Sequence, residues 1–508
     1  MSSLVHNWPA QKIHAIVVTD GSRILGLGDL GVNGLGISIG KLDIYCAGAG
    51  FHPSRVMPVV IDVGTNNEQL LNHPLYFGLR RQRLEGDAYY ELIDEFMRAV
   101  LARYPNVLIQ FEDFSTNHAQ ALLDRYRDHH LVFNDDIQGT ATTVRPFFRN
   151  ASIPPPRLTP SLFYLSPLSV CVCVCVCGEI GAQVLGGIYG ALAVKGLSAS
   201  ALASQQFVVC GAGSAGMGVV SFLAKAMSKH GITEEEARQR FWILDVDGLI
   251  TSGRDGHVPD FVRPFARMDA ELEGADLLSV IQHAKPTVLI GASTVGGLFT
   301  SDHLGEMTKH CDRPLVMALS NPTSKLECTS EQCAAWTKGR GIYAAGSPQP
   351  DCVYDGKEVA SSQANNMYIF PGLALGASVG KAKVITDAML MKASESLVDC
   401  ITAEELERGS IYPKLGSIRE ISLEIACSVI EQAVRDGVTK AESRAVEVLA
   451  EQGREGLRGF VRSRMFQVSE SRYHPVAKKK KLTRAPILLQ TRKPNYDPLV
   501  YVPPGIGE

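Results

Sequence analysis

Short apolar segments that end in small or acidic residues alternate along most of this chain with segments of helical spacing. In the first 134 residues the apolar segments are AIVVTD, MPVVIDVG and NVLIQFED, and residues 89–104 (YYELIDEFMRAVLARY) carry apolar side chains at helical intervals. Residues 184–360 repeat the pattern with FVVCGAGSAGMG, FWILDVDG, TVLIGAS and LVMALSNPT. Strands that alternate with helices form parallel sheets. The pattern therefore predicts an α/β fold.

The composition is that of a globular protein. The chain has 508 residues, of which 45% are hydrophobic and 20% charged, with a formal net charge of −3. These values exclude a disordered, collagen-like or disulfide-scaffold chain and disfavour a dedicated nucleic-acid or membrane-surface binder. We expect a parallel-sheet domain over residues 1–134, a Rossmann-type domain over 135–365, a mostly helical part over 366–466 that returns to the first domain, and a tail over 467–508.

Two segments do not fit the alternation. Residues 144–183 contain the repeat CVCVCVC, and residues 468–493 contain four consecutive lysines. Within the first segment, residues 158–178 carry no charge and match a membrane span in length, but Pro160 and Pro167 interrupt them, so we expect no membrane segment. The N-terminus shows neither a secretory signal nor the Arg-rich character of a transit peptide.

Two pairs of carboxylates each come directly after an apolar strand-like segment. Glu112 and Asp113 follow VLIQF, and Asp135 and Asp136 follow LVFN. Because parallel strands end at one edge of their sheet, these four side chains can converge there. Oxygen ligands of this kind suit Mg²⁺ or Mn²⁺ and not Zn²⁺. Either pair alone could equally be a solvated strand end, so both interpretations stay open on the pattern alone.

A glycine turn lies between the strand-like FVVC and the helical VVSFLAKAM, with Gly211, Gly213 and Gly216 in Gly-x-Gly-x-x-Gly spacing. The first glycine permits a tight turn, the second lets the backbone approach a pyrophosphate, and the third packs the helix against the strand. Asp245 ends the next strand-like segment and could accept hydrogen bonds from ribose hydroxyls. The pattern predicts a dinucleotide site.

One lysine and a few asparagines complete the set of polar positions. The glycine-rich residues 26–40 end at Lys41 without the Gly-Lys-Ser/Thr spacing of a P-loop. A lysine beside an apolar wall can act as a base, although the surface is its commoner place. Asn321 in ALSNPT and Asn365 with Asn366 in QANNMYIFPG stand where strand-like segments give way to turns. Such asparagines can bind a small carboxylate or cap a turn.

Taken together, these motifs resemble the malic enzyme family. The resemblance runs through VVTDGSRILGLGDLG, FEDF, FNDDIQGTA, GAGSAG, ALSNPT, GSP and NNMYIFPG, in the family's order and over nearly everything except the two odd segments. The resemblance implies that Lys41 is the general base and that Asp135 lies beside it. The implied metal ligands are Glu112, Asp113 and Asp136, the malate contacts are Arg23, Asn321 and Asn365, and the cofactor contacts are Arg23, Asp136, Gly211, Gly213, Ser214, Ala215, Gly216 and Asp245.

The implied reaction is the oxidative decarboxylation of (S)-malate to pyruvate and CO₂, with reduction of NAD or NADP and with Mg²⁺ or Mn²⁺ as cofactor. NADP-type members carry a lysine just before a Pro-aromatic pair, where this chain has Val262 followed by Arg263. Asp245 would also repel a 2′-phosphate. We expect NAD, while Arg254 and Arg263 leave NADP open. The resemblance also implies a dimer or tetramer, malate as the partner, and no nucleic acid.

The chain departs from the family pattern at three places. Family members carry an N-terminal region with the tyrosine that protonates the enolate and with helices that form the dimer, whereas only a short stretch without tyrosine precedes VVTDG here. The compartment, mitochondrial matrix or cytoplasm, therefore stays open. Deleting residues 144–183 joins GTATT to VLGGIYGALAVKG, and a TG repeat encodes alternating Cys-Val. We therefore interpret residues 144–183 as a retained intron. We interpret residues 468–493 in the same way.

Three alternatives remain at this point. A Lys-rich tail could be a patch for an anionic partner. A malolactic-type enzyme would convert malate to lactate without net reduction of the cofactor. A catalytically impaired homologue would bind malate, metal or nucleotide without completing the reaction.

Overall fold

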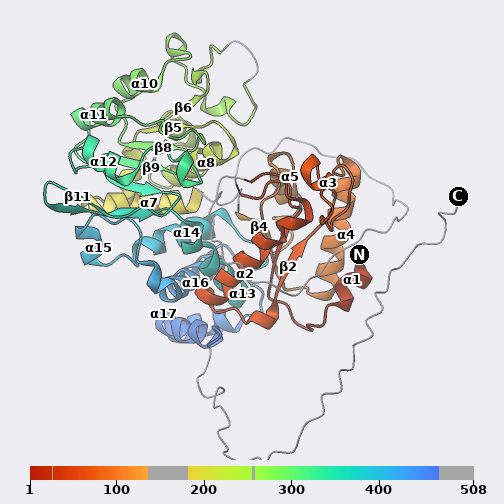
Figure 1. Cartoon of the computed structure of the whole chain (residues 1–508). Helices are drawn as coiled ribbons and strands as arrows, with labels where there is room; N and C mark the ends of the chain where they lie inside the picture. The colour runs from red at the N-terminus through yellow and green to blue at the C-terminus, as the bar shows by residue number, and fades with distance from the viewer. Residues whose placement is uncertain (26, 136–180, 255–257, 468–508) are drawn as a thin grey trace, which may run out of the picture. The chain divides into compact units, whose positions relative to one another are not determined.

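The computed structural model describes residues 1–25, 27–135, 181–254 and 258–467, which contain two parallel sheets (Figure 1). The first sheet has the order β2 (Val56–Val60), β1 (Ala15–Thr19), β3 (Leu108–Phe111) and β4 (Val132–Asn134), with every neighbouring pair parallel. Every residue of β1, β3 and β4 is buried. Such unbroken burial is typical of a parallel sheet that is covered on both faces.

Helices cover the two faces of the first sheet with different sets of side chains. Ile16, Val18 and Ile109 share a core with α4 (Asp87–Arg103) and α5 (Thr116–Tyr126). Ala15 and Val17 point the other way, because successive side chains of a strand alternate in direction. On that second face lie α2 (Leu35–Ala49) and the C-terminal α13 (Phe370–Val379).

The second sheet has seven strands in the order β13-β10-β9-β8-β5-β6-β7. All of its pairs are parallel except β6 with β7. Its strands are β5 (Phe207–Cys210), β6 (Phe241–Asp245), β7 (Gly248–Leu249), β8 (Val288–Gly291), β9 (Leu315–Ala318), β10 (Ile342–Ala345) and β13 (Ser361–Gln363). The chain runs from β5 to β6 on one side and then crosses to β8 on the other. This reversal creates a switch point at the carboxyl end of β5, where doubly wound sheets bind ligands.

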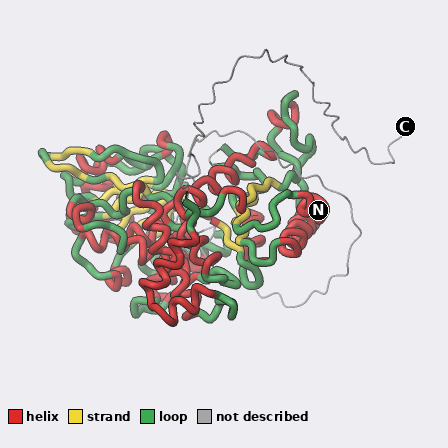
Figure 2. Tube along the Cα trace, turned by 90° about the horizontal axis from the view of Figure 1, so that it is seen from below, coloured by secondary structure: helices red, strands yellow, loops and turns green. Residues whose placement is uncertain are grey.

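Helices lie over both sheets, as the tube in Figure 2 shows. Those associated with the second sheet are α7 (Gly181–Val194), α8 (Ser214–Ser228), α9 (Glu234–Arg238), α10 (Leu277–Ala284), α11 (Ser301–His310) and α12 (Ser330–Trp336). The C-terminal helices after α13 are α14 (Asp387–Val398), α15 (Ala403–Glu407), α16 (Ile418–Arg435) and α17 (Arg444–Arg464). The short elements α1 (Ser2–Asn7), α3 (Glu68–Asn72), β11 (Cys352–Tyr354) and β12 (Lys357–Val359) complete the described fold, along with several 3₁₀ turns.

Two local predictions agree with these elements. The helix expected at residues 89–104 is α4, in which Leu92, Ile93, Phe96 and Val100 are buried. The Thr N-cap signal in ITAEELERG is also present: the Thr402 hydroxyl accepts from the backbone of α15, and a glutamate side chain bonds back to the cap, which is a capping box. The α/β fold with a Rossmann-type sheet and a helical C-terminal part is thus confirmed.

The predicted domain boundaries stay predictions, because residues 1–466 form one compact unit. Gly181, Ala182 and Gln183, at the end of the predicted 144–183 insertion, are buried in the first turn of α7. The rest of that segment, with its uncharged run, and residues 468–493 lie outside the described residues. In the described part of the chain, none of the helices has both the length and the apolar character needed to cross a bilayer.

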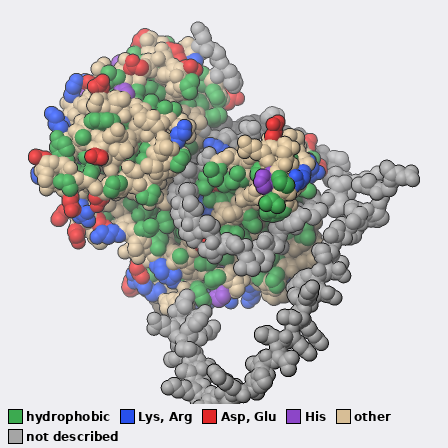
Figure 3. All heavy atoms as spheres, viewed as in Figure 1, with side chains coloured by type: hydrophobic (Ala, Val, Ile, Leu, Met, Phe, Trp, Pro, Cys, Tyr) green, Lys and Arg blue, Asp and Glu red, His purple; other side chains and the backbone are tan. Residues whose placement is uncertain are grey.

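The surface carries charges of both signs. In Figure 3, acidic and basic side chains are interspersed over the part of this face that the grey atoms leave visible. Ion pairs such as Arg458 with Glu424 and Arg462 with Glu420 join α17 to α16. Exposed pairs of this kind contribute little to stability individually.

Candidate active site

Buried carboxylates gather at the edge where β3 and β4 end. Glu112 and Asp113 follow β3, and Asp135 follows β4; they are 0%, 4% and 4% exposed. They meet because β3 and β4 are parallel neighbours with Phe111 opposite Asn134. The fourth predicted member of the cluster, Asp136, lies outside the described residues.

Lys41 lies between two of these carboxylates. Its Nζ is 3.0 Å from Asp135 Oδ2 and 3.1 Å from Glu112 Oε1. The side chain extends from α2, which packs on β1 and β2, and its ammonium also lies 4.9 Å from the ring centre of Phe370. Lys41 is only 7% exposed, so its charge depends on these partners.

The electrostatics of the cluster follow from its burial. Burial raises the pKa of Asp135 to about 7; Lys41 opposes the rise and the charge of Glu112 adds to it. Burial also raises the pKa of Asp113, again with Glu112 adding to the rise, while Lys41 and Arg23 oppose it. A divalent cation or a second ammonium would stabilise both carboxylates in their charged forms.

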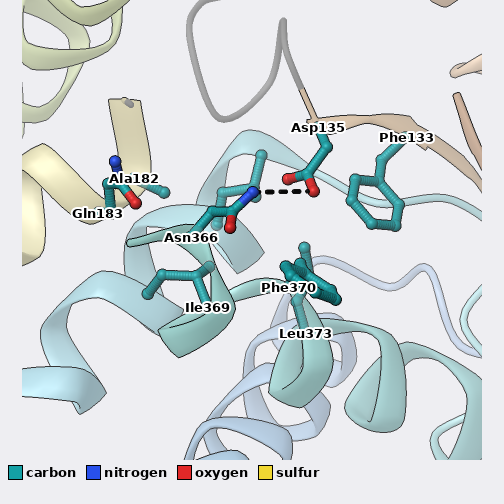
Figure 4. Close-up of a pocket in the computed structure, with 9 residues that line it drawn as sticks. Phe133, Asp135, Ala182, Gln183, Asn366, Ile369, Phe370 and Leu373 are labelled. Carbon is teal, nitrogen blue, oxygen red and sulfur yellow. Dashed lines mark hydrogen bonds between the residues drawn. The ribbon is translucent and has the colours of Figure 1, made fainter. Parts of the chain in front are cut away.

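Asn365 and Asn366 make different contacts, and only Asn366 bonds to the carboxylates. Asn366 donates from Nδ2 to Asp135 Oδ2 at 3.2 Å, which Figure 4 draws as a dashed line. Asn365, the predicted malate contact, instead accepts from the backbone N–H of Met367 at 3.0 Å and so caps a 3₁₀ turn. Both are buried, at 7% and 2% exposure. Apolar side chains line the space beside Asp135 and Asn366, namely those of Phe133, Ile369, Phe370, Leu373 and Leu390.

The segment that carries Arg23 is tethered beside the carboxylates. The Arg23 backbone N–H donates to the carbonyl oxygen of Asp113 at 3.3 Å, and Leu25 N–H donates to Asp113 Oδ2 at 3.0 Å. The Arg23 side chain is exposed. It therefore lies at the rim of the cluster, where an anionic substrate can reach it.

Asn321 stands at the carboxyl edge of the second sheet. It follows β9, its Oδ1 accepts from Ser347 Oγ, and its Nδ2 donates to the carbonyl oxygen of Leu319 at 3.4 Å. Its peptide bond to Pro322 is cis. Among the described residues these hydrogen bonds hold Asn321 to its own sheet, and none joins it to the Lys41 cluster.

The glycine turn has a geometry that suits a dinucleotide. Gly211 has φ +126°, and a Cβ there would lie 2.4 Å from the carbonyl oxygen of Ala292. A Cβ on Gly216 would lie 1.9 Å from the carbonyl oxygen of Gly211, so helix α8 packs directly on the turn. A Cβ on Gly213 would meet no atom within 4 Å. That open side, at the N-terminus of α8 where Ser214 and Ala215 begin the helix, is the cradle that a pyrophosphate needs.

Asp245, the last residue of β6, lies at the end of the strand next to β5. Its Oδ2 accepts from Arg254 Nη1 at 2.5 Å. Arg254 also pairs with Glu273 and donates to the carbonyl oxygen of Leu249 at 2.8 Å. Arg263 is exposed and lies 3.4 Å from Asp260, while Val262 is buried. The two arginines that left NADP open are thus already paired with carboxylates.

Two of the three predicted metal ligands, Glu112 and Asp113, are buried side by side after β3. Glu112 and Asp113 supply the hard oxygen donors that Mg²⁺ and Mn²⁺ prefer, and Glu112 Oε1 is buried with the Lys41 ammonium 3.1 Å away. Within the described ranges no three His, Cys, Asp or Glu side chains are arranged to hold a metal ion. The third predicted ligand, Asp136, is outside those ranges, so the donors present fit a metal site that is not complete without it.

Two residues of this cluster were not predicted from the sequence, Gln110 and Tyr45. Gln110 is a fully buried glutamine in the middle of β3, and Tyr45 is a fully buried tyrosine of α2 that donates to it. One signal was available: Gln110 is two residues before Glu112, and positions i and i+2 of a strand point to the same face. No local signal pointed to Tyr45.

Family models and known proteins match most of this chain. The family model described as malic enzyme, N-terminal domain, matches residues 1–127, and that described as malic enzyme, NAD binding domain, matches residues 179–434. The chain is 42% identical over 440 residues to the NADP-dependent malic enzyme of Dictyostelium discoideum, covering 86% of this chain and 73% of that protein. It is also 42% identical over 468 residues to a mitochondrial NAD-dependent malic enzyme of Solanum tuberosum, covering 89% and 68%.

Solved structures show the same fold. The malic enzyme of Entamoeba histolytica superimposes with a TM-score of 0.61 at 20% identity, over 91% of this chain and 76% of that one. The malic enzyme from Pyrococcus horikoshii gives a TM-score of 0.59 at 21% identity, over 90% and 82%. With two family models in chain order and relatives at 42% identity over most of its length, the chain belongs to the malic enzyme family.

Proposed function

We propose that this protein catalyses the oxidative decarboxylation of (S)-malate to pyruvate and CO₂, with reduction of a nicotinamide dinucleotide. The observation that carries the proposal is Lys41, buried within 3.1 Å of both Glu112 and Asp135 at the edge of a parallel sheet. Relatives named as NAD- and NADP-dependent malic enzymes, at about 42% identity, support the same reaction.

The residues divide the chemistry as follows. Lys41, in its amine form, takes the proton of the C2 hydroxyl while hydride leaves C2 for the nicotinamide ring. Asp135 and Glu112 stabilise the ammonium that forms. The C3–C4 bond then breaks to release CO₂, its electron pair remains on the enolate of pyruvate, and a separate acid protonates C3. Arg23, at the exposed rim, attracts the substrate carboxylate.

A divalent cation would be held by Glu112, Asp113 and Asp136. Mg²⁺ or Mn²⁺ bound there supplies Lewis-acid polarisation of the oxygen on C2. Asp113 is positioned for this role, because its side chain is buried, its Oδ2 accepts from the Leu25 N–H, and its backbone has φ +54°.

We propose NAD as the preferred dinucleotide. Asp245 carries a carboxylate to the place where ribose hydroxyls would lie, and Arg254 is already occupied by Asp245, Glu273 and a carbonyl oxygen. Because Arg254 is held by two carboxylates and a carbonyl oxygen, it is not free to offset the charge of a 2′-phosphate.

One assay tests the reaction and separates it from the alternative. The 508-residue protein is incubated with (S)-malate, Mn²⁺ and NAD or NADP, and the reduced dinucleotide is followed at its absorbance while pyruvate, lactate and CO₂ are quantified. Equal amounts of pyruvate, CO₂ and NADH are expected. Lactate without net NADH would show a malolactic enzyme instead, and no product would show an impaired homologue.

The cellular setting is proposed on the family alone. We propose that the protein works in the mitochondrial matrix or the cytoplasm as a homodimer or homotetramer. Relatives named as mitochondrial support the first compartment. Light scattering on the purified protein checks the oligomeric state, and fractionation of cells that express it checks the compartment.

A further inference from the structure

A buried glutamine lies at the centre of the carboxylate cluster without an assigned role. Gln110 is in the third position of β3 and is 0% exposed. A buried amide costs free energy unless its donors and acceptor are all paired. An apolar side chain could be buried at this position of the strand without such a cost, so the contacts of Gln110 need an explanation.

Every side of the Gln110 amide has a charged or polar partner. Its Nε2 donates to Glu112 Oε2 at 2.6 Å and to Asp135 Oδ2 at 2.9 Å. Its Oε1 accepts from the Tyr45 hydroxyl at 2.5 Å. Carboxylates only accept, so the NH₂ group must face them and the oxygen must face Tyr45.

Tyr45 keeps the amide in this orientation. The ring is fully buried between Phe51 and Phe370, with centroids at 5.2 and 5.1 Å. Burial and the two nearby carboxylates raise the pKa of Tyr45, so the hydroxyl keeps the proton that it donates to Gln110 Oε1. A flipped amide would set its oxygen against Glu112 and Asp135 and would lose the hydrogen bond that the Tyr45 hydroxyl now donates to Oε1.

We propose that Gln110 is a positioning residue for the reaction: its amide holds Glu112 and Asp135 at one spacing, with Tyr45 locking the amide. This inference rests on the proposed function, in which Glu112 binds the metal and Asp135 supports Lys41. Two buried carboxylates with a shared neighbour repel one another, and a neutral double donor between them keeps both in place.

Gln110 bridges the two carboxylates that flank Lys41. Asp135 Oδ2 accepts from Lys41, Gln110 and Asn366, and Glu112 Oε2 accepts from the same Gln110 amide. The amide therefore ties both carboxylates to one position of β3 and fixes their spacing beside Lys41.

Three substitutions test the proposal on the full-length protein, with Mn²⁺ affinity measured in the absence of substrate and kcat and KM for malate measured separately. Gln110→Met keeps the volume and removes both donors; we expect a loss of about tenfold to 100-fold in kcat and about tenfold in Mn²⁺ affinity, the usual size of an outer-sphere effect. Gln110→Glu adds a third carboxylate and should do worse in kcat. Tyr45→Phe removes one hydrogen bond and should cost about fivefold in kcat.

The matched control is Tyr126→Phe, which removes a buried hydroxyl that donates to Asp94 at 2.5 Å on the opposite face of the sheet. It should leave kcat and Mn²⁺ affinity unchanged. Combining Tyr45→Phe with Gln110→Met should be no worse than Gln110→Met alone, because the hydroxyl acts only through the amide.

Other results overturn the inference. Gln110→Met with kcat and Mn²⁺ affinity within about twofold of the wild type would make Gln110 a space-filling residue. If that variant does not fold, Tyr45→Phe decides, and unchanged values would reject the proposal. A wild type that binds Mn²⁺ but does not turn over malate rejects the proposed function alone, since the variants' Mn²⁺ affinities still report on Gln110. A wild type that does neither rejects both.

Discussion

The carboxylate cluster and the glycine turn are built in opposite ways. The cluster consists of side chains from α2, from β3, from the residues directly after β3 and β4, and from the turn before α13, all buried and tied to one another by hydrogen bonds. The turn is one continuous stretch, and its ligand-facing surface is backbone with an open side at Gly213. The cluster therefore depends on the positions of distant elements, whereas the turn depends on local backbone conformation. Substitutions should separate these two dependences.

The largest effect is expected at Lys41. Lys41→Met removes the proposed base and leaves two buried carboxylates without their cation, so kcat should fall by about 10³-fold, the size of a lost general base. Lys225→Met is the control, because Lys225 also pairs with a partly buried carboxylate, Asp387 at 3.2 Å, outside the site. Steady-state kinetics with malate measure both. Equal losses in the two variants would contradict the role of Lys41.

The glycine turn offers a matched pair of substitutions. Gly216→Ala puts a Cβ 1.9 Å from the Gly211 carbonyl oxygen and should lower the free energy of unfolding by about 2 kcal/mol. The added methyl group of Gly213→Ala meets no protein atom, so the free energy of unfolding should not change. The same methyl group fills the cradle and should raise KM for NAD about tenfold, which is equivalent to ~1.4 kcal/mol of binding. Urea denaturation and kinetics separate the two. A Gly213→Ala variant with an unchanged KM would argue against a dinucleotide at this turn.

A smaller effect is expected on the choice between NAD and NADP when Asp245 is replaced. Asp245→Ala removes the carboxylate that opposes a 2′-phosphate and releases Arg254 from one of its two carboxylate partners. The ratio of kcat/KM for NADP to that for NAD should rise about tenfold. Asp260→Ala, which touches only the exposed Arg263, should leave the ratio unchanged. A fall in the ratio on Asp245→Ala would mean that the Asp245–Arg254 pair serves NADP.

The smallest effect is a pH-dependent one in the loop that carries Arg23. Asp29 accepts hydrogen bonds from Arg83 Nη2 at 2.7 Å and from Arg83 Nε at 2.8 Å. Burial by itself would raise the pKa of Asp29, but these bonds outweigh it and lower the pKa below its usual 3.8. The stabilisation is therefore present above pH 3.8 and is lost as the pH falls through the lowered value. Asp29→Asn should cost about 1 kcal/mol at pH 7, after solvent screening, and little at pH 2. Urea midpoints at both pH values check this, and an equal cost at both would contradict it.

Features that depend on neighbouring residues could be predicted from the sequence, because periodicity and turn chemistry act within a few residues. They are the α/β alternation, the helix at 89–104, the Thr402 cap and the position of the glycine turn after a strand. The convergence of Glu112 and Asp135 followed from the rule that parallel strands end at one edge. Which member of the Asn365–Asn366 pair contacts Asp135 could not be predicted, since one residue of register decides it.

Taken by itself, the sequence determined the fold class, the carboxylates at strand ends, the Gly-x-Gly-x-x-Gly turn and membership of the malic enzyme family. Only the tertiary structure decided that Lys41 pairs with Glu112 as well as with Asp135, that Gln110 and Tyr45 complete their network, and that Arg254 pairs with Asp245. The physical reason is the range of the interactions. Strand and turn patterns arise from neighbouring residues, whereas a hydrogen bond between distant side chains exists only once sheet order, register and helix packing have brought them together.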